Sequence, residues 1–221
     1  MTPTTRPTTA ATFTGIPDEA LEFYEGLEAD NSKAYWTDHK HIYDTQVRGP
    51  IVALCEALCS ERDDFHVFRP YRDLRFAKDK RPYKTHQGAT VGKHYLQIGA
   101  SGLFVATGYY RMAADQIAAF RSAVDDDMTG AELEELVSDL REFGYVVDGD
   151  TLKTRPRGYP PDHPRIDLLR HRSLVAWADL GAPDWLSTPA AVDHVVAAWR
   201  DIEPLRDWLD RNVGPSTEPR R

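Results

Sequence analysis

The spacing of apolar residues changes at about Asp64, and this change limits the folds that the chain can adopt. Before Asp64, apolar side chains recur at helical spacing, as Leu21, Tyr24 and Leu27 do. Short runs rich in aromatic and β-branched residues follow, interrupted by Gly and Pro, a pattern typical of strands. Helical spacing returns at about residue 113. Helical blocks that alternate with antiparallel hairpins predict the α+β class, with a sheet of about five or six strands and helices packed mainly on one side.

Individual elements follow from local signals. Helices are expected near residues 17–27, 32–46, 50–58, 113–125 and 130–143, and from residue 187 onward with a break or bend at Pro204. Residues 94–99 and 103–111 are predicted to form a hairpin through Ala100, Ser101 and Gly102. A second hairpin is predicted over 145–155 around Asp148-Gly149-Asp150, and one more strand over 173–180.

The termini differ in composition from the middle of the chain. Residues 1–13 and 213–221 contain little that can pack, so we expect two disordered tails around a single domain at 14–212. The sequence has neither a run of about twenty apolar residues nor a secretory signal at its start. We therefore expect a cytoplasmic protein with no membrane partner, and a monomer by default.

One basic segment stands out in an acidic chain. Between Arg69 and Lys84, seven cations face two anions, a balance of +5, so the remainder must carry −13 to give the net charge of −8. A protein that holds a long polyanion is usually basic as a whole, because each neutralised phosphate releases counterions. The charge balance therefore argues against nucleic acid and favours one local positive site.

The phase of this segment divides its side chains between two faces. If residues 69–76 are extended, one face carries Arg69, Tyr71, Asp73 and Arg75, and the other carries Arg72, Leu74 and Phe76. The second face is predicted to point inward, where Arg72 requires a carboxylate or a bound anion. Asp73 lies close enough to Arg69 and Arg75 to pair with one of them.

Two interpretations of the basic segment remain open from the residues alone. In the first, the segment binds a small phosphate- or carboxylate-bearing ligand through Arg69, Arg72, Arg75, Lys80, Tyr83 and Lys84. Catalysis on that ligand would use Asp73, Asp79 or His86, the titratable groups nearby. In the second, the same charges form an internal salt-bridge network in a structural or protein-interaction module. Nucleic-acid association comes third.

A second positive segment spans residues 156–172. Its candidate side chains are Tyr159, His163 and Arg170. An internally paired, rigid connection is the alternative interpretation. The eight histidines show no metal-binding spacing, and no nucleotide-binding or nucleophile motif occurs, so neither a metal nor a cofactor is expected.

The basic segment also carries a recognisable motif. It reads Arg69-x-x-Arg72-Asp73-x-Arg75-Phe76-x-x-Asp79-Lys80-x-x-Tyr83. This string resembles the defining motif of the DUF2461 family, found in bacteria and fungi, and the similarity extends over about 14–212. Relatives typically have Asn-Asn and Trp-Phe where this chain has Asp30-Asn31 and Tyr35-Trp36. The resemblance implies that the basic segment matters, but the family has no established activity that would say why.

Overall fold

The computed structural model describes residues 12–60, 63–75 and 79–218. The described chain divides into two compact units. The first contains the residues up to Phe104 together with Asp179–Val196, and the second contains Val105–Ala178 and the residues from Ala197 onward. Each unit is described by itself below. The predicted single domain over 14–212 stays a prediction.

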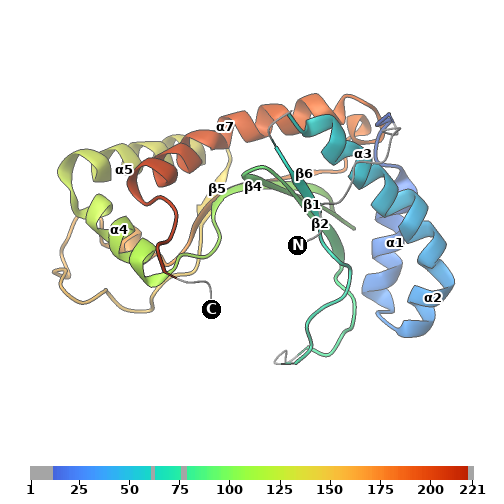
Figure 1. Ribbon diagram of the computed structural model, residues 1–221, viewed down its shortest axis with the longest axis horizontal. Helices are drawn as coiled ribbons and strands as arrows, with labels where there is room; N and C mark the ends of the chain where they lie inside the picture. Colours follow the sequence, from blue (N-terminus) through green and yellow to red (C-terminus); the bar gives the residue numbers. More distant parts are fainter. Residues whose placement is uncertain (1–11, 61–62, 76–78, 219–221) are drawn as a thin grey trace. The chain divides into compact units, whose positions relative to one another are not determined.

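Helices open the first unit. They are α1 (Asp18–Ala29), α2 (Lys33–Ile42), the π-helix η1 (Tyr43–Arg48) and α3 (Gly49–Leu58). Acidic Asp18 and Glu19 occupy the first turn of α1, where they complement the helix dipole. The Ser32 hydroxyl accepts the Tyr35 N–H at 3.1 Å and so caps α2. Figure 1 shows α1 and α2 side by side.

The sequence predicted one α-helix over 32–46, and the π-helix was not expected. The π-helix has wider turns than an α-helix, and such turns are rare and occur frequently at functional sites. Buried Tyr43 and Val47 lie on η1. No local sequence signal announces this change of helix type.

A single antiparallel sheet of six strands confirms the predicted fold class. Its strands are β1 (Phe65–Val67), β2 (His86–Val91), β3 (His94–Gly99), β4 (Gly102–Tyr109), β5 (Val146–Asp148) and β6 (Leu174–Gly181). The order in the sheet is β1-β2-β3-β4-β6-β5, so β1 and β5 are the edge strands. Strands β4 and β6 and helix α7 each contribute residues to both units.

The strand predictions met with mixed results. The hairpin through Ala100 and Ser101 and the strand near 173–180 are confirmed as β3–β4 and β6. The hairpin over 145–155 is wrong: β5 pairs with β6, with Val147 opposite Ala176, and Thr151 bridges His171 instead. Strand β2 was missed, because its first residues continue a polar, Pro-containing stretch that is typical of a loop.

The second unit holds α4 (Ala114–Asp125), α5 (Asp127–Glu142), the short α6 (Ile166–Leu169) and most of α7 (Ala191–Asn212), while the short 3-10 helix η2 (Asp184–Ser187) belongs to the first unit. Helix α5 begins earlier than predicted because the Asp126 carboxylate accepts the N–H groups of Met128 and Thr129. Helix α7 contains Pro204 without ending there, so of the two predicted alternatives the break does not occur, and the bend stays a prediction.

Each unit has its own buried apolar side chains. In the first unit, fully buried large residues include Tyr24, Leu27, Leu54, Leu96 and Ile98. In the second, they include Phe120, Leu133, Leu169 and Trp208. Burying one such side chain stabilises the fold by about 1.5–3 kcal/mol relative to leaving it exposed. Among the residues described, no helix combines the length and apolar character needed to cross a bilayer.

Candidate functional site

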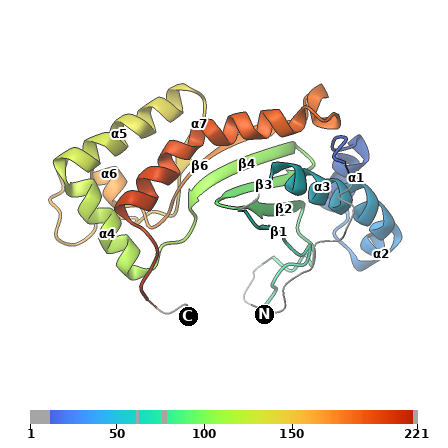
Figure 2. The ribbon, with the colours of Figure 1, turned by 45° about the horizontal axis from the view of Figure 1, so that its top comes forward.

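The basic segment forms an extension of the sheet edge, which we call the arm and define as residues 68–75 and 79–85. It continues beyond the ends of β1 and β2 in both views (Figures 1 and 2). Its two sides pair across an isolated bridge between Tyr71 and Tyr83. Flanking backbone bonds run from Arg72 N–H to the Pro82 carbonyl (2.9 Å) and from Lys84 N–H to the Pro70 carbonyl (2.8 Å). The arm is thus extended and antiparallel, although it forms no regular strand.

Burial along the arm alternates residue by residue. The side chains at 69, 71, 73 and 75 are exposed, and those at 70, 72 and 74 are half-buried. This is the phase that the sequence predicted for the two faces. Phe76 and Lys78, which the motif and the charge count include, lie outside the described residues.

Arg72 has an internal partner. Its Nη1 lies 2.5 Å from Asp79 Oδ2, and the same carboxylate accepts Arg81 Nε at 2.9 Å. Hydrogen bonds from Arg81 and then Arg72 hold the pKa of Asp79 well below its usual range. Of the two partners that the sequence allowed for Arg72, a carboxylate or a bound anion, the other side of the arm supplies the carboxylate.

Arg75 is also paired, with Asp73. Arg75 Nη2 lies 2.6 Å from Asp73 Oδ2, and Arg75 Nε lies 3.0 Å from Oδ1. These side-chain hydrogen bonds lower the pKa of Asp73 to about 2. Lys80 Nζ donates to the Leu74 carbonyl at 3.2 Å. Arg72, Arg75 and Lys80, three of the predicted anion ligands, are thus engaged within the arm.

Tyr83 lies at the base of the arm and is held by the turn between α1 and α2. The Asn31 side chain accepts Tyr83 N–H at 3.0 Å and donates to the Tyr83 carbonyl at 3.2 Å, so it takes the place of a neighbouring strand. The Tyr83 ring is 5% exposed and stacks on Trp36 with centroids 4.4 Å apart and planes 8° apart. The Tyr83 ring is therefore part of the packing at the base of the arm, and the ligand contact that the sequence predicted for it stays a prediction.

A buried polar chain supports the same region. The Tyr43 hydroxyl of η1 donates to Gln87 Oε1 at 2.6 Å. Gln87 Nε2 donates in turn to the carbonyls of Phe68 (2.7 Å) and Gly88 (2.9 Å). Gln87 is buried, so its amide has no water to replace these partners. This chain of hydrogen bonds fixes the backbone immediately before Arg69. No pattern in the sequence predicted it.

Arg69, Lys84 and His86 differ from the other basic residues of the segment. In the described part of the chain, neither Arg69 nor Lys84 forms an ion pair with a carboxylate. The Lys84 Nζ lies 5.4 Å from the centre of the Phe68 ring. Burial, and then the charge of Arg69, lower the pKa of Lys84. Burial, and then the charge of Lys84, lower the pKa of His86. Arg69 and Lys84 form a local excess of positive charge, and His86 lies beside Lys84.

The three catalytic candidates, Asp73, Asp79 and His86, differ in the cause and the effect of their lowered pKa values. The carboxylates of Asp73 and Asp79 are stabilised as anions by arginines, so both are weak bases near neutral pH. His86 is half-buried, with a lowered pKa that keeps its ring neutral at neutral pH. Within the described residues, no group of three His, Cys, Asp or Glu side chains could hold a metal ion.

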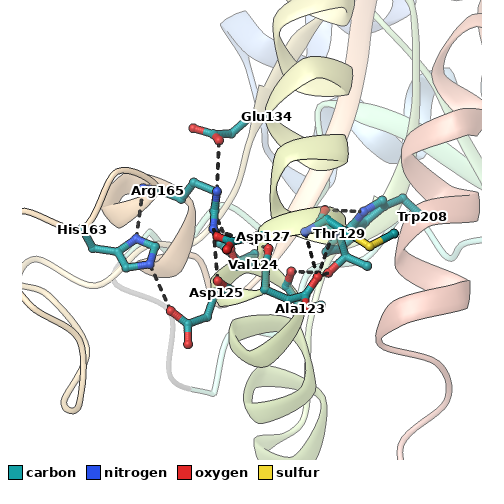
Figure 3. Close-up of polar contacts among 11 residues, drawn as sticks. Ala123, Val124, Asp125, Asp127, Thr129, Glu134, His163, Arg165 and Trp208 are labelled. Carbon is teal, nitrogen blue, oxygen red and sulfur yellow. Dashed lines mark hydrogen bonds and ion pairs between the residues drawn. The ribbon is translucent and has the colours of Figure 1, made fainter.

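The second positive segment belongs to the other unit and is fastened internally (Figure 3). His163 Nδ1 accepts the Arg165 N–H at 3.0 Å, so Nε2 carries the proton of the neutral ring and donates to Asp125 Oδ1 at 3.0 Å. Arg170 Nε donates to the Leu152 carbonyl at 2.8 Å. The Tyr159 ring lies edge-on to His163, with centroids 6.1 Å apart. Both nitrogens of His163 are occupied, which favours the rigid-connection interpretation.

Arg165 is the buried cation that sequence reasoning did not single out. Its side chain is 8% exposed, and Nε donates to the Val124 carbonyl at 2.6 Å while Nη2 donates to the Asp125 carbonyl at 3.0 Å (Figure 3). Glu134 Oε2 lies 3.6 Å from Nη1. The guanidinium thus satisfies the last carbonyls of α4, where a cation also complements the helix dipole.

Comparison with known proteins adds a family assignment. The profile of a family described as conserved hypothetical protein (DUF2461) matches residues 19–208, most of the chain. The chain belongs to the DUF2461 family. No curated protein and no solved structure matches it. The DUF2461 match spans the arm, the α1–α2 turn that holds Tyr83, and the Arg165 cluster.

Proposed function

We propose that this DUF2461 protein binds a small anion, a phosphate or a carboxylate group, through Arg69 and Lys84, with His86 beside them. The observation that carries the proposal is the placement of Lys84. Its ammonium group is partly removed from water and lies near a second cation, and both effects lower its pKa. A partly buried cation next to a second cation is usually paired with a carboxylate, and the described residues provide none for Lys84.

A bound anion would relieve this unfavourable charge distribution. One phosphate oxygen can accept a charge-assisted hydrogen bond from each cation, and such bonds contribute about 1.5–3 kcal/mol each. Two of them correspond to a dissociation constant in the millimolar range, which is appropriate for a small anion without other contacts. Arginine supplies paired donors and lysine a point charge, so both phosphate and carboxylate groups fit.

The internal salt bridges explain the remaining charges. Arg72 and Arg81 share Asp79, and Arg75 pairs with Asp73, so these groups fix the course of the arm. This part of the segment agrees with the salt-bridge interpretation of the motif. The proposal therefore narrows the predicted ligand set of six residues to Arg69 and Lys84 and assigns the others to holding the arm.

Titration with inorganic phosphate and with acetate, followed by isothermal calorimetry, tests the proposal. Lys84→Gln and Arg69→Gln should each weaken phosphate binding by about tenfold to a hundredfold, the loss of one charge-assisted bond. Arg75→Gln is the matched control: it removes an exposed cation of the same arm that already has a partner, and should change the affinity less than twofold.

Two outcomes would overturn the proposal. One is phosphate binding that Lys84→Gln leaves unchanged, and the other is an equal loss in Lys84→Gln and Arg75→Gln, which would indicate a diffuse charge effect. Urea unfolding of all three variants shows whether each remains folded. If Lys84→Gln unfolds, Lys84→Arg replaces it. This variant retains the positive charge and should therefore retain phosphate binding.

A further inference from the structure

Tyr71 presents an aromatic ring to solvent next to the proposed anion site. Its exposed fraction is 47%, and among the described Phe, Tyr and Trp residues of the first unit it is the only exposed one. The ring is held from behind: its centroid lies 5.9 Å from that of Trp36 and 5.5 Å from that of Tyr83. Trp36 and Tyr83 stack on each other and are buried. Tyr71 is therefore the outer ring of a three-ring cluster.

The cluster is rigid at its inner side. Asn31 fixes the Tyr83 backbone with two hydrogen bonds, and the bridge between Tyr71 and Tyr83 fixes the two sides of the arm against each other. An exposed ring with such support loses little conformational freedom when a ligand stacks on it. Isolated exposed apolar residues are common on protein surfaces, so exposure alone would carry no inference.

Proximity to Arg69 gives the exposed ring its significance. Arg69 and Tyr71 are two residues apart on the exposed face of an extended segment, a spacing of about 6.5–7 Å along the chain. Lys84 lies close enough to Arg69 for their charges to interact. A planar ring and a cation pair at this separation match a molecule that carries an anionic group one short linker away from an aromatic ring.

We infer that the anion bound by this protein is attached to an aromatic ring that stacks on Tyr71, and that a nucleoside monophosphate represents its chemical class. The inference rests on the proposed function and names its ligand class. A small ligand is favoured over a nucleic-acid strand because the net charge of the chain is −8 and Arg72, Arg75 and Arg81 are internally paired.

Binding of three probes to the full chain tests the inference: inorganic phosphate, adenosine 5′-monophosphate and adenosine. Stacking of one base on an aromatic side chain corresponds to an affinity gain of about tenfold or more. We therefore expect adenosine 5′-monophosphate to bind at least about tenfold more tightly than phosphate. Tyr71→Leu should remove this gain and leave phosphate binding unchanged, whereas Tyr71→Phe should preserve it.

Each outcome separates the inference from the function on which it rests. Equal affinities for phosphate and adenosine 5′-monophosphate, or a Tyr71→Leu chain that binds both as the wild type does, would overturn the stacking inference and leave anion binding intact. Absence of phosphate binding in the wild type would overturn anion binding itself. Tighter binding of a single-stranded oligothymidylate than of adenosine 5′-monophosphate would overturn the choice of a small ligand.

Discussion

The alternation of side chains along the arm predicts which residues face inward, but it does not identify their partners. The alternation placed Arg72 on the inner face and required a carboxylate or a bound anion for it, and the Asp79 carboxylate lies 2.5 Å from its guanidinium. The phase of one extended segment does not identify Asp79, because that residue lies seven positions further along the chain, on the other side of the arm. The same limit applies to Asn31, which lies 52 positions from Tyr83. Only the family resemblance drew attention to its region.

Asn31→Ala should destabilise the protein. The substitution removes both side-chain bonds to Tyr83 and leaves a partly buried N–H without its acceptor, which costs about 1–3 kcal/mol. Asn31→Asp retains the acceptor for Tyr83 N–H and should lose less. Urea unfolding measures the free energy of unfolding of both variants. An Asn31→Ala chain as stable as the wild type would show that the two bonds are replaced by water.

His86 should make stability depend on pH. Its pKa in the folded state is below the unfolded value of about 6.5, because of burial and the nearby Lys84 charge. As pH falls below that value, the unfolded state takes up a proton before the folded state does, so stability is lost on acidification. Urea unfolding between pH 7.5 and about pH 5 should show a smaller loss for His86→Gln than for the wild type, and identical slopes would refute the prediction.

At the level of elements, close approach determines where glycine is needed. Gly130 lies in the first turns of α5, and a Cβ there would lie 2.2 Å from the Val124 carbonyl oxygen and 2.6 Å from Arg165 Nε. The end of α4, the guanidinium and the start of α5 are therefore packed at van der Waals distance. Sequence reasoning placed α4 within a residue, but it could not find this contact because glycine inside a helix carries no signal of its neighbours.

Gly130→Ala should lower stability although alanine favours helices. Relief of the clash with Val124 and Arg165 requires movement that costs about 1–3 kcal/mol, more than the gain in helix propensity. Gly49→Ala in α3 is the matched control, since the atom nearest to an added Cβ would lie 3.4 Å away and the φ of Gly49, −58°, is helical. Gly49→Ala should raise stability slightly in thermal unfolding. A Gly130→Ala chain that also gains stability would contradict the packing account.

For the molecule as a whole, the uneven distribution of charge is the main consequence of the sequence. The chain has a net charge of −8 and yet contains a basic arm. Arg72, Arg75 and Arg81 of the arm pair with carboxylates of the arm itself. The spacing of apolar residues was sufficient to predict the fold class, and the importance of the basic segment stays a prediction. The sequence alone could not separate Arg69 and Lys84 from the paired arginines, because pairing is decided by tertiary contacts.

Salt dependence should report how many cations face outward. The logarithm of the binding constant for a single strand falls linearly with the logarithm of the salt concentration, with a slope of about −0.7 per neutralised phosphate. With Arg69 and Lys84 as the available pair, oligothymidylate binding should have a slope of about −1.4. Fluorescence anisotropy across a range of NaCl concentrations measures it. A slope near −3.5, as for five phosphates, would mean that the paired arginines open to bind.

The stack of Trp36 on Tyr83 has a spectroscopic consequence. Of the five tryptophans in the chain, Trp36 lies against the base of the arm, with its ring parallel to that of Tyr83 at 4.4 Å. Two aromatic chromophores held at such a separation couple electronically, and the coupling depends steeply on their geometry. Near-ultraviolet circular dichroism of the wild type minus that of Trp36→Phe therefore isolates an optical reporter built into the protein, which follows the base of the arm without any attached label.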